Sequence, residues 1–107
     1  MNTVLRETVV RVIGLRGALD VADAEPLRET LADALAQSAK LIVIDLRRVT
    51  FMGARVAGVL VTAGREARGQ GVRLVLLQPR GIVARMLSLL GVLGYFEVVH
   101  HRGDANR

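Results

Sequence analysis

The apolar residues of this chain gather in short segments with two kinds of spacing. Four segments are rich in Val, Ile and Leu, and they either alternate with polar residues or run continuously, as strands do. The run LIVIDL is interrupted only by Asp45, and such a run predicts a central strand buried on both faces. We therefore expect strands over residues 8–15, 41–46, 72–77 and 96–99.

The segments between these strands have helical spacing. The first helix is expected over residues 22–37, with Asp23 as its N-cap. Pro26 would then lie in the first turn, where its missing N–H costs nothing. A leucine at every fourth position forms the predicted buried stripe of this helix, namely Leu27, Leu31 and Leu35.

Two further helices are expected over residues 53–68 and 81–90, each ended by glycines. Gly58 and Gly64 lie inside the earlier of the two, where a glycine costs about 1 kcal/mol relative to alanine. We expect them to permit close contact between this helix and the sheet. The inner face of the earlier helix is predicted to contain Val56, Leu60, Ala63 and Ala67. The inner face of the later one is predicted to contain Ile82, Met86 and either Leu89 or Leu90.

Strands that alternate with helices predict an α/β sheet covered by helices. The 107 residues suit one domain, which we place at residues 1–107, and the 51% of apolar residues can fill a core. Gly14 and Gly17 mark a bend or turn. The chain has no cysteine, no segment typical of a secretory signal and no run near the ~18 apolar residues of a membrane span. We expect a cytoplasmic protein.

The net charge of +5 is unevenly distributed along the chain. Residues 1–39 carry a net charge of −2, and residues 40–107 carry +7. A basic half can indicate a nucleic acid or an acidic protein partner. The arginines are scattered, however, and aromatic residues make up only 3% of the chain, too few for a platform on which bases stack. We therefore expect no nucleic-acid partner.

Residues 41–60, LIVIDLRRVTFMGARVAGVL, suggest a buried strand, a short loop and the start of a helix. This segment closely resembles the phosphoswitch segment of the STAS domain, the fold of bacterial anti-sigma factor antagonists. Residues 17–20, GALD, resemble the family's Gly-Glu-Leu-Asp turn, with Ala18 in place of the glutamate. Residues 71–79 resemble the following helix-to-strand turn and strand end. The resemblance implies an α/β STAS-type single domain, with a mostly parallel or mixed sheet of about five strands covered by three or more helices.

The chain departs from the family at the switch itself. In the family, Asp-Ser-Ser-Gly opens the helix and the second serine is phosphorylated. The four corresponding positions here are Gly53, Ala54, Arg55 and Val56. Arg55 occupies the position of the phosphoacceptor and cannot accept a phosphate, and Gly53 lacks the side-chain oxygen that caps a helix. We therefore expect the frame of the switch without its phosphorylation.

The resemblance implies a regulatory protein-binding module, not an enzyme, that docks on a kinase-like anti-sigma factor. No cofactor and no metal ion are implied, and a homodimer stays open as a further partner. The alternative is a structural STAS subunit of a larger assembly, such as a stressosome-like scaffold or the accessory subunit of a lipid-transport ATPase. The partner-binding positions that the resemblance carries over are Asp20, Gly53, Ala54, Arg55 and Val56.

Several polar residues have two interpretations. Arg55 lies in the first turn of a helix, where a cation is disfavoured by about 0.3–1 kcal/mol. It either contacts an acidic group of a partner or is a solvated surface residue. Asp20 either faces a partner or caps a turn, and Asp45 is either a functional acid or a hydrogen-bonded residue at a strand end. His100 and His101 are adjacent, so they lie on opposite faces of an extended chain and do not indicate a metal site.

The apolar residues near the C-terminus exceed what one helix face can bury. They either mark a dimer or partner surface or belong to a thick core. The set consists of Val83, Leu87, Leu90, Val92 and Leu93.

Overall fold

The computed structural model describes residues 9–100, in which four strands alternate with three α-helices and one short 3-10 helix. The strands are β1 (Val10–Leu19), β2 (Leu41–Met52), β3 (Arg73–Leu77) and β4 (Glu97–Val99). The α-helices are α1 (Val21–Ala36), α2 (Ala54–Gln70) and α3 (Gly81–Leu89), and the 3-10 helix is η1 (Val92–Tyr95). No α-helix within residues 9–100 is both long and apolar enough to cross a membrane.

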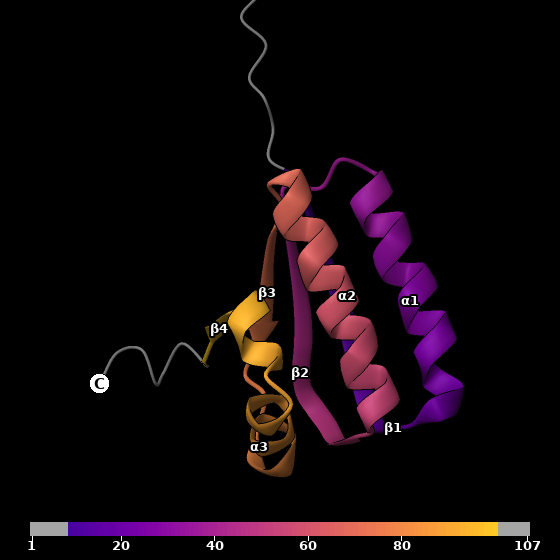
Figure 1. The fold of residues 1–107 in the computed structure, drawn as a ribbon, viewed down its shortest axis with the longest axis vertical. Coiled ribbons are helices and arrows are strands. Elements are labelled where there is room, and N and C mark those ends of the chain that lie inside the picture. The colour runs from indigo at the N-terminus through magenta and orange to yellow at the C-terminus, as the bar shows by residue number, and fades with distance from the viewer. Residues whose placement is uncertain (1–8, 101–107) are drawn as a thin grey trace, which may run out of the picture.

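The four strands form one parallel sheet in the order β1-β2-β3-β4. Helices α1 and α2 lie side by side on one face of this sheet, and α3 lies at the end where both of these helices begin (Figure 1). The predicted α/β class is therefore confirmed. The described residues contain one strand fewer than the approximate five that were expected, and the sheet is wholly parallel among them.

The first two strands are longer than the sequence pattern predicted. β1 runs to Leu19 and β2 runs to Met52, and these two residues are paired in the sheet. The register of β1 against β2 shifts after Gly14 and again after Gly17, which has a φ of 79°. Such irregularities bend a strand without ending it. Residues 17–19 therefore belong to β1, and the turn predicted at residues 17–20 is wrong for these three residues. Thr8, the expected start of the strand, lies outside the described residues.

Helix α1 begins at Val21 because Asp20, not Asp23, is its N-cap. Pro26 therefore lies more than one turn inside the helix, and the expectation that it occupies the first turn is wrong. A proline there leaves the carbonyl four residues earlier without its helical donor. The predicted buried stripe is confirmed, since Leu27, Leu31 and Leu35 are all buried.

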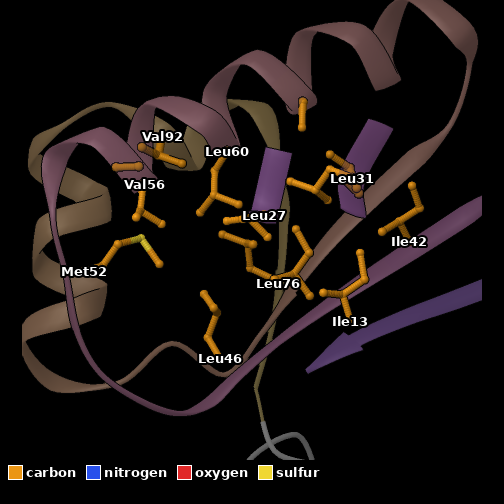
Figure 2. Packing of buried hydrophobic residues seen from close by; sticks show 14 of the residues in the cluster. Ile13, Leu27, Leu31, Ile42, Leu46, Met52, Val56, Leu60, Leu76 and Val92 are labelled. Atoms are coloured by element: carbon orange, nitrogen blue, oxygen red, sulfur yellow. The ribbon is translucent and has the colours of Figure 1, made fainter. Parts of the chain in front are cut away.

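The core lies between the sheet and its helices and includes the inner face predicted for α2 (Figure 2). The inner face predicted for α3 is wrong. Val83 and Leu87 are fully buried, whereas Ile82 is 54% exposed and Leu89 is 79% exposed. Both stripes have helical spacing, so the periodicity alone favours neither of them. Because Val83, Leu87 and Val92 belong to the core, they cannot form the dimer surface that was one of their two interpretations.

The two glycines inside α2 have different surroundings. A Cβ atom built on Gly64 would lie 2.7 Å from the Cβ of Tyr95, so this glycine permits close contact with η1 rather than with the sheet. Gly58 is exposed, and a Cβ there would meet no atom within 4 Å. The expected helix-to-sheet contact is therefore absent at Gly58.

Candidate functional site

The N-termini of α1 and α2 lie close together at the end of the sheet where β1 and β2 finish (Figure 1). The backbone N–H of Gly53 donates a hydrogen bond to the carbonyl of Leu19 over 2.9 Å. Leu19 immediately precedes the N-cap of α1, and Gly53 is the N-cap of α2. This bond brings Asp20 close to Gly53, although they are 33 positions apart in the sequence.

Asp20 has the capping role that was one of its two predicted interpretations. Its Oδ1 atom accepts a hydrogen bond from the backbone N–H of Ala22 over 3.2 Å, and the Oδ2 atom of Asp23 accepts one from the backbone N–H of Asp20 over 2.9 Å. This reciprocal arrangement satisfies donors that a helix N-terminus otherwise leaves free. The side chain of Asp20 remains exposed beside the start of α2.

The first turn of α2 differs from that of α1 because no side chain caps it. Ala54 and Arg55 are exposed, and no acidic residue lies in this turn. The turn therefore presents uncapped backbone N–H groups next to one long basic side chain. We call residues 53–56 the switch turn.

Val56, the last residue of the switch turn, faces inward. It is fully buried and lies in the core together with Met52 (Figure 2). Its side chain cannot reach a partner from this position, and its packing in the core anchors the switch turn to the rest of the domain. A surface contact by Gly53, Ala54 and Arg55 is compatible with the exposure of that turn.

Exposed apolar side chains lie at the same end of the molecule as the switch turn, and the sequence pattern did not identify them as a group. Phe51 precedes the turn by two residues, and it is 41% exposed. Helix α3, at the same end of the molecule (Figure 1), turns one apolar stripe to the core and leaves the other exposed. The exposed residues of this stripe are Ile82, Leu89 and Leu90. The signal for them was the second apolar stripe of α3, which had been assigned to the core.

Comparisons with known proteins identify the family. The model of the STAS domain matches residues 2–105. This chain belongs to the STAS domain family. The anti-sigma-F factor antagonist RsfB of Mycobacterium tuberculosis is 28% identical over 103 residues, a match that covers 96% of this chain and 84% of RsfB.

Solved structures agree with the membership of this STAS domain in the family. An anti-sigma factor antagonist from Mycobacterium paratuberculosis is 26% identical, with a TM-score of 0.76 over 96% of this chain and 87% of that one. The anti-sigma factor antagonist SpoIIAA in its unphosphorylated form superposes with a TM-score of 0.73 over 95% of this chain and 89% of that one. Because the two sequences are only 21% identical, this superposition shows a shared fold and no more.

Asp45 of this STAS domain is hydrogen-bonded, as one interpretation predicted, but it is not at the end of its strand. Its Oδ1 atom accepts hydrogen bonds from the backbone N–H and from the Nε of Arg47, both over 3.0 Å. These hydrogen bonds with the Arg47 side chain are the main reason that the pKa of Asp45 lies below its usual range. Since β2 continues to Met52, Asp45 lies well away from the switch turn.

The two histidines, which were not expected to bind a metal ion, lie at the end of the part of the chain that the structure describes. His100 is exposed, and His101 lies outside the described residues. Among residues 9–100, the structure contains no group of three or more side chains that could hold a metal ion.

Proposed function

We propose that this STAS domain is a regulatory protein-binding module that docks on a kinase-like anti-sigma factor. Its similarity to RsfB and to the antagonist of M. paratuberculosis supports this role. Such a factor regulates transcription, so we place the domain in the cytoplasm. We further propose that docking takes place without the serine phosphoswitch of the family.

The observation that carries the proposal is the switch turn, which exposes Ala54 and Arg55, is firmly positioned and has no hydroxyl group. The hydrogen bond between Gly53 and Leu19 fixes the turn from one side, and the buried side chain of Val56 fixes it from below. Arg55 occupies the position of the phosphoacceptor and is exposed. A guanidinium group cannot be esterified, so the surface is present permanently in one charge state.

The docking surface that we propose has a polar part and an apolar part. The polar part consists of Asp20 and the exposed residues of the switch turn, Ala54 and Arg55, and the apolar part consists of Phe51, of Ile82 and Leu89 in α3, and of Leu90 just after it. Protein interfaces commonly combine an apolar centre with a polar rim. The burial of exposed leucine and phenylalanine side chains supplies a driving force that the switch turn alone does not have.

Binding and phosphorylation of the purified domain test the proposal together. A kinase-like anti-sigma factor encoded near this chain is mixed with it, binding is measured by isothermal titration calorimetry, and labelled ATP is added. We expect binding, and no label within residues 53–58, whereas Arg55→Ser restores a hydroxyl and accepts label there. Absence of binding at micromolar concentrations contradicts the proposed function, and label in the unaltered switch turn contradicts the absence of a phosphoswitch.

The role of Arg55 is a separate part of the proposal. If its guanidinium contacts an acidic group of the partner, Arg55→Ala weakens binding and Arg55→Glu weakens it further, because like charges then face each other. Unchanged affinity for both variants assigns Arg55 to the solvated surface, while the function of the domain stands.

A further inference from the structure

An open groove runs between α1 and α2 on the surface of the domain. A hollow of about 270 Å³ is lined by Arg28, Arg55, Gly58, Val59 and Thr62. A second hollow of about 120 Å³ continues it, shares Arg28, Val59 and Thr62, and reaches Glu66. The two helices that form the walls pack directly against each other (Figure 1). We call these two hollows together the α1–α2 groove.

The charges of the α1–α2 groove are separated along its length. Arg28 is held by Glu25, which accepts a hydrogen bond from the Nε of Arg28 over 3.0 Å, so its charge is largely compensated. Arg55, at one end, makes no ion pair with any residue between 9 and 100. Glu66 lies at the other end, three turns further along α2. The groove is therefore basic at the end next to the switch turn, and Glu66 gives the far end an acidic side chain in the hollow that Arg28 also lines.

Gly58 forms an opening in the wall of the groove. It is exposed, and a Cβ atom there would have no neighbour within 4 Å, so packing within the domain does not explain a glycine. Glycine is the least favourable residue in the interior of a helix apart from proline. Its absence of a side chain exposes the α2 backbone one turn after Arg55, where another chain can approach closely.

We propose that the α1–α2 groove receives a segment of the protein partner that carries an acidic side chain at one end and a basic side chain at the other. A carboxylate of that segment pairs with Arg55, its main chain passes over Gly58, and a basic side chain faces Glu66. The planar guanidinium of Arg55 suits two parallel hydrogen bonds to a carboxylate. The inference rests on the proposed function, and it extends the docking surface from the switch turn to the middle of α2.

A substitution that fills the opening tests the groove without changing its charge. Gly58→Gln places a long side chain over the path of the partner, and glutamine favours a helix more than glycine does. Gly69→Gln is the matched control, since Gly69 is also exposed in α2, has no neighbour within 4 Å of an added Cβ and lies outside the groove. We expect Gly58→Gln to bind the anti-sigma factor about tenfold more weakly than the parent. Gly69→Gln should bind with unchanged affinity, and neither variant should have a lower midpoint of urea unfolding.

The charge arrangement is tested by reversing the charge at each end of the groove in turn. Arg55→Glu and Glu66→Arg should each weaken binding, and the affinity of the unaltered domain should fall as salt is raised, because exposed ion pairs are screened. Arg55→Lys should retain part of the affinity, since it keeps the charge and loses the paired hydrogen bonds.

The failure of this inference can be separated from the failure of the proposed function by one more variant. Leu89→Asp alters the apolar part of the docking surface and leaves the groove intact. If Leu89→Asp weakens binding while Gly58→Gln and Arg55→Glu bind as the parent does, the function stands and the groove proposal is overturned. If the unaltered domain does not bind, both fail. A homodimer that Gly58→Gln dissociates in sedimentation experiments would make a second copy the occupant and would also overturn the inference.

Discussion

The backbone N–H of Gly53 and the carbonyl of Leu19 are joined by a hydrogen bond of 2.9 Å. It links the last residue of β1 to the N-cap of α2, so that two helices begin from neighbouring points of one sheet edge. The position of the switch turn is thus set by the backbone, although its side chains depart from the family pattern.

The N-cap of α2 can accept a capping side chain. Gly53 has a φ of −76°, which any residue adopts, and an added Cβ would lie 3.6 Å from the carbonyl oxygen of Leu19, an ordinary contact. We expect Gly53→Ser to raise the free energy of unfolding by about 0.5–1 kcal/mol, since it adds a cap and restricts the unfolded chain. Urea unfolding followed by circular dichroism measures the change. Gly53→Ala adds no acceptor and should gain less; an equal gain for both would contradict the capping argument.

The capping box of α1 makes a separate contribution to stability. Asp20→Ala removes the acceptor used by the N–H of Ala22 and should lower the free energy of unfolding by about 1 kcal/mol. Asp20→Asn keeps an oxygen at the same place and should lose much less. The comparison also separates stability from binding, because a drop in partner affinity for Asp20→Asn, at unchanged stability, would show that the carboxylate itself faces the partner.

Gly64 is predicted to be intolerant of any side chain. Tyr95 is held over α2 by Arg65 and Arg68, whose guanidinium carbons lie 5.6 Å and 5.3 Å from the centre of its ring. Since a Cβ on Gly64 would lie 2.7 Å from that of Tyr95, Gly64→Ala should destabilise the domain by about 1–3 kcal/mol through overpacking.

The control for this prediction is another glycine of α2. Gly58 has free space around it, so Gly58→Ala should stabilise the domain by about 0.5–1 kcal/mol through helix propensity alone. A similar stabilisation by Gly64→Ala would show that η1 moves away from α2 at little cost.

The orientation of α3 predicts opposite outcomes for two leucines. Leu87 is fully buried, and Leu87→Ala should lower the free energy of unfolding by about 2–5 kcal/mol. Leu89 is 79% exposed, and Leu89→Ala should change it by less than about 0.5 kcal/mol. Thermal unfolding distinguishes the two, and the reverse order would place α3 in the orientation that its sequence pattern first suggested.

Asp45 predicts a loss of stability in acid. Its pKa is lowered mainly by the side chain of Arg47, so its charged form stabilises the folded state above the unfolded pKa of about 4. That contribution is lost as the pH falls through the lowered pKa. The difference in free energy of unfolding between the parent and Asp45→Asn should therefore be constant from pH 7 to pH 5 and shrink below about pH 4.

Asp33→Asn removes a negative charge from an exposed position of α1 and serves as the control for net charge. A difference for Asp45→Asn that persists unchanged at the lowest pH would show that its ion pair with Arg47 contributes little to stability.

The sequence predicted the element order and the buried face of α2 because polar and apolar residues are clearly separated there. Arg65, Glu66 and Arg68 mark the outer face of that helix, and all three are exposed. The full length of β2 was not predictable in the same way. Arg47 and Arg48 interrupt its apolar run after Leu46, yet β1 continues to pair with β2 beyond them, past the irregularities at its own glycines.

The candidate site was predictable in position but not in extent. Arg55 lies exposed in the first turn of its helix, as the motif suggested, whereas Asp20, which was expected in a turn before the first helix, is the N-cap of that helix. The exposed face of α3 was missed because Ile82 and Leu89 have the same spacing and hydrophobicity as the residues that pack inward. Only the path of the chain from β3 through α3 to η1 decides which stripe is buried. The α1–α2 groove depends on the approach of two helices that are distant in sequence, which no local pattern records.

The strands of this sheet follow one another in space in the same order as in the chain, β1-β2-β3-β4. In open parallel sheets, the crevice that admits a small molecule forms where the direction of winding reverses. The four described strands contain no such reversal, so their carboxyl ends form a continuous rim rather than the mouth of a cleft. In the proposed function, the partner contacts this rim, where the N-caps Asp20 and Gly53 lie side by side.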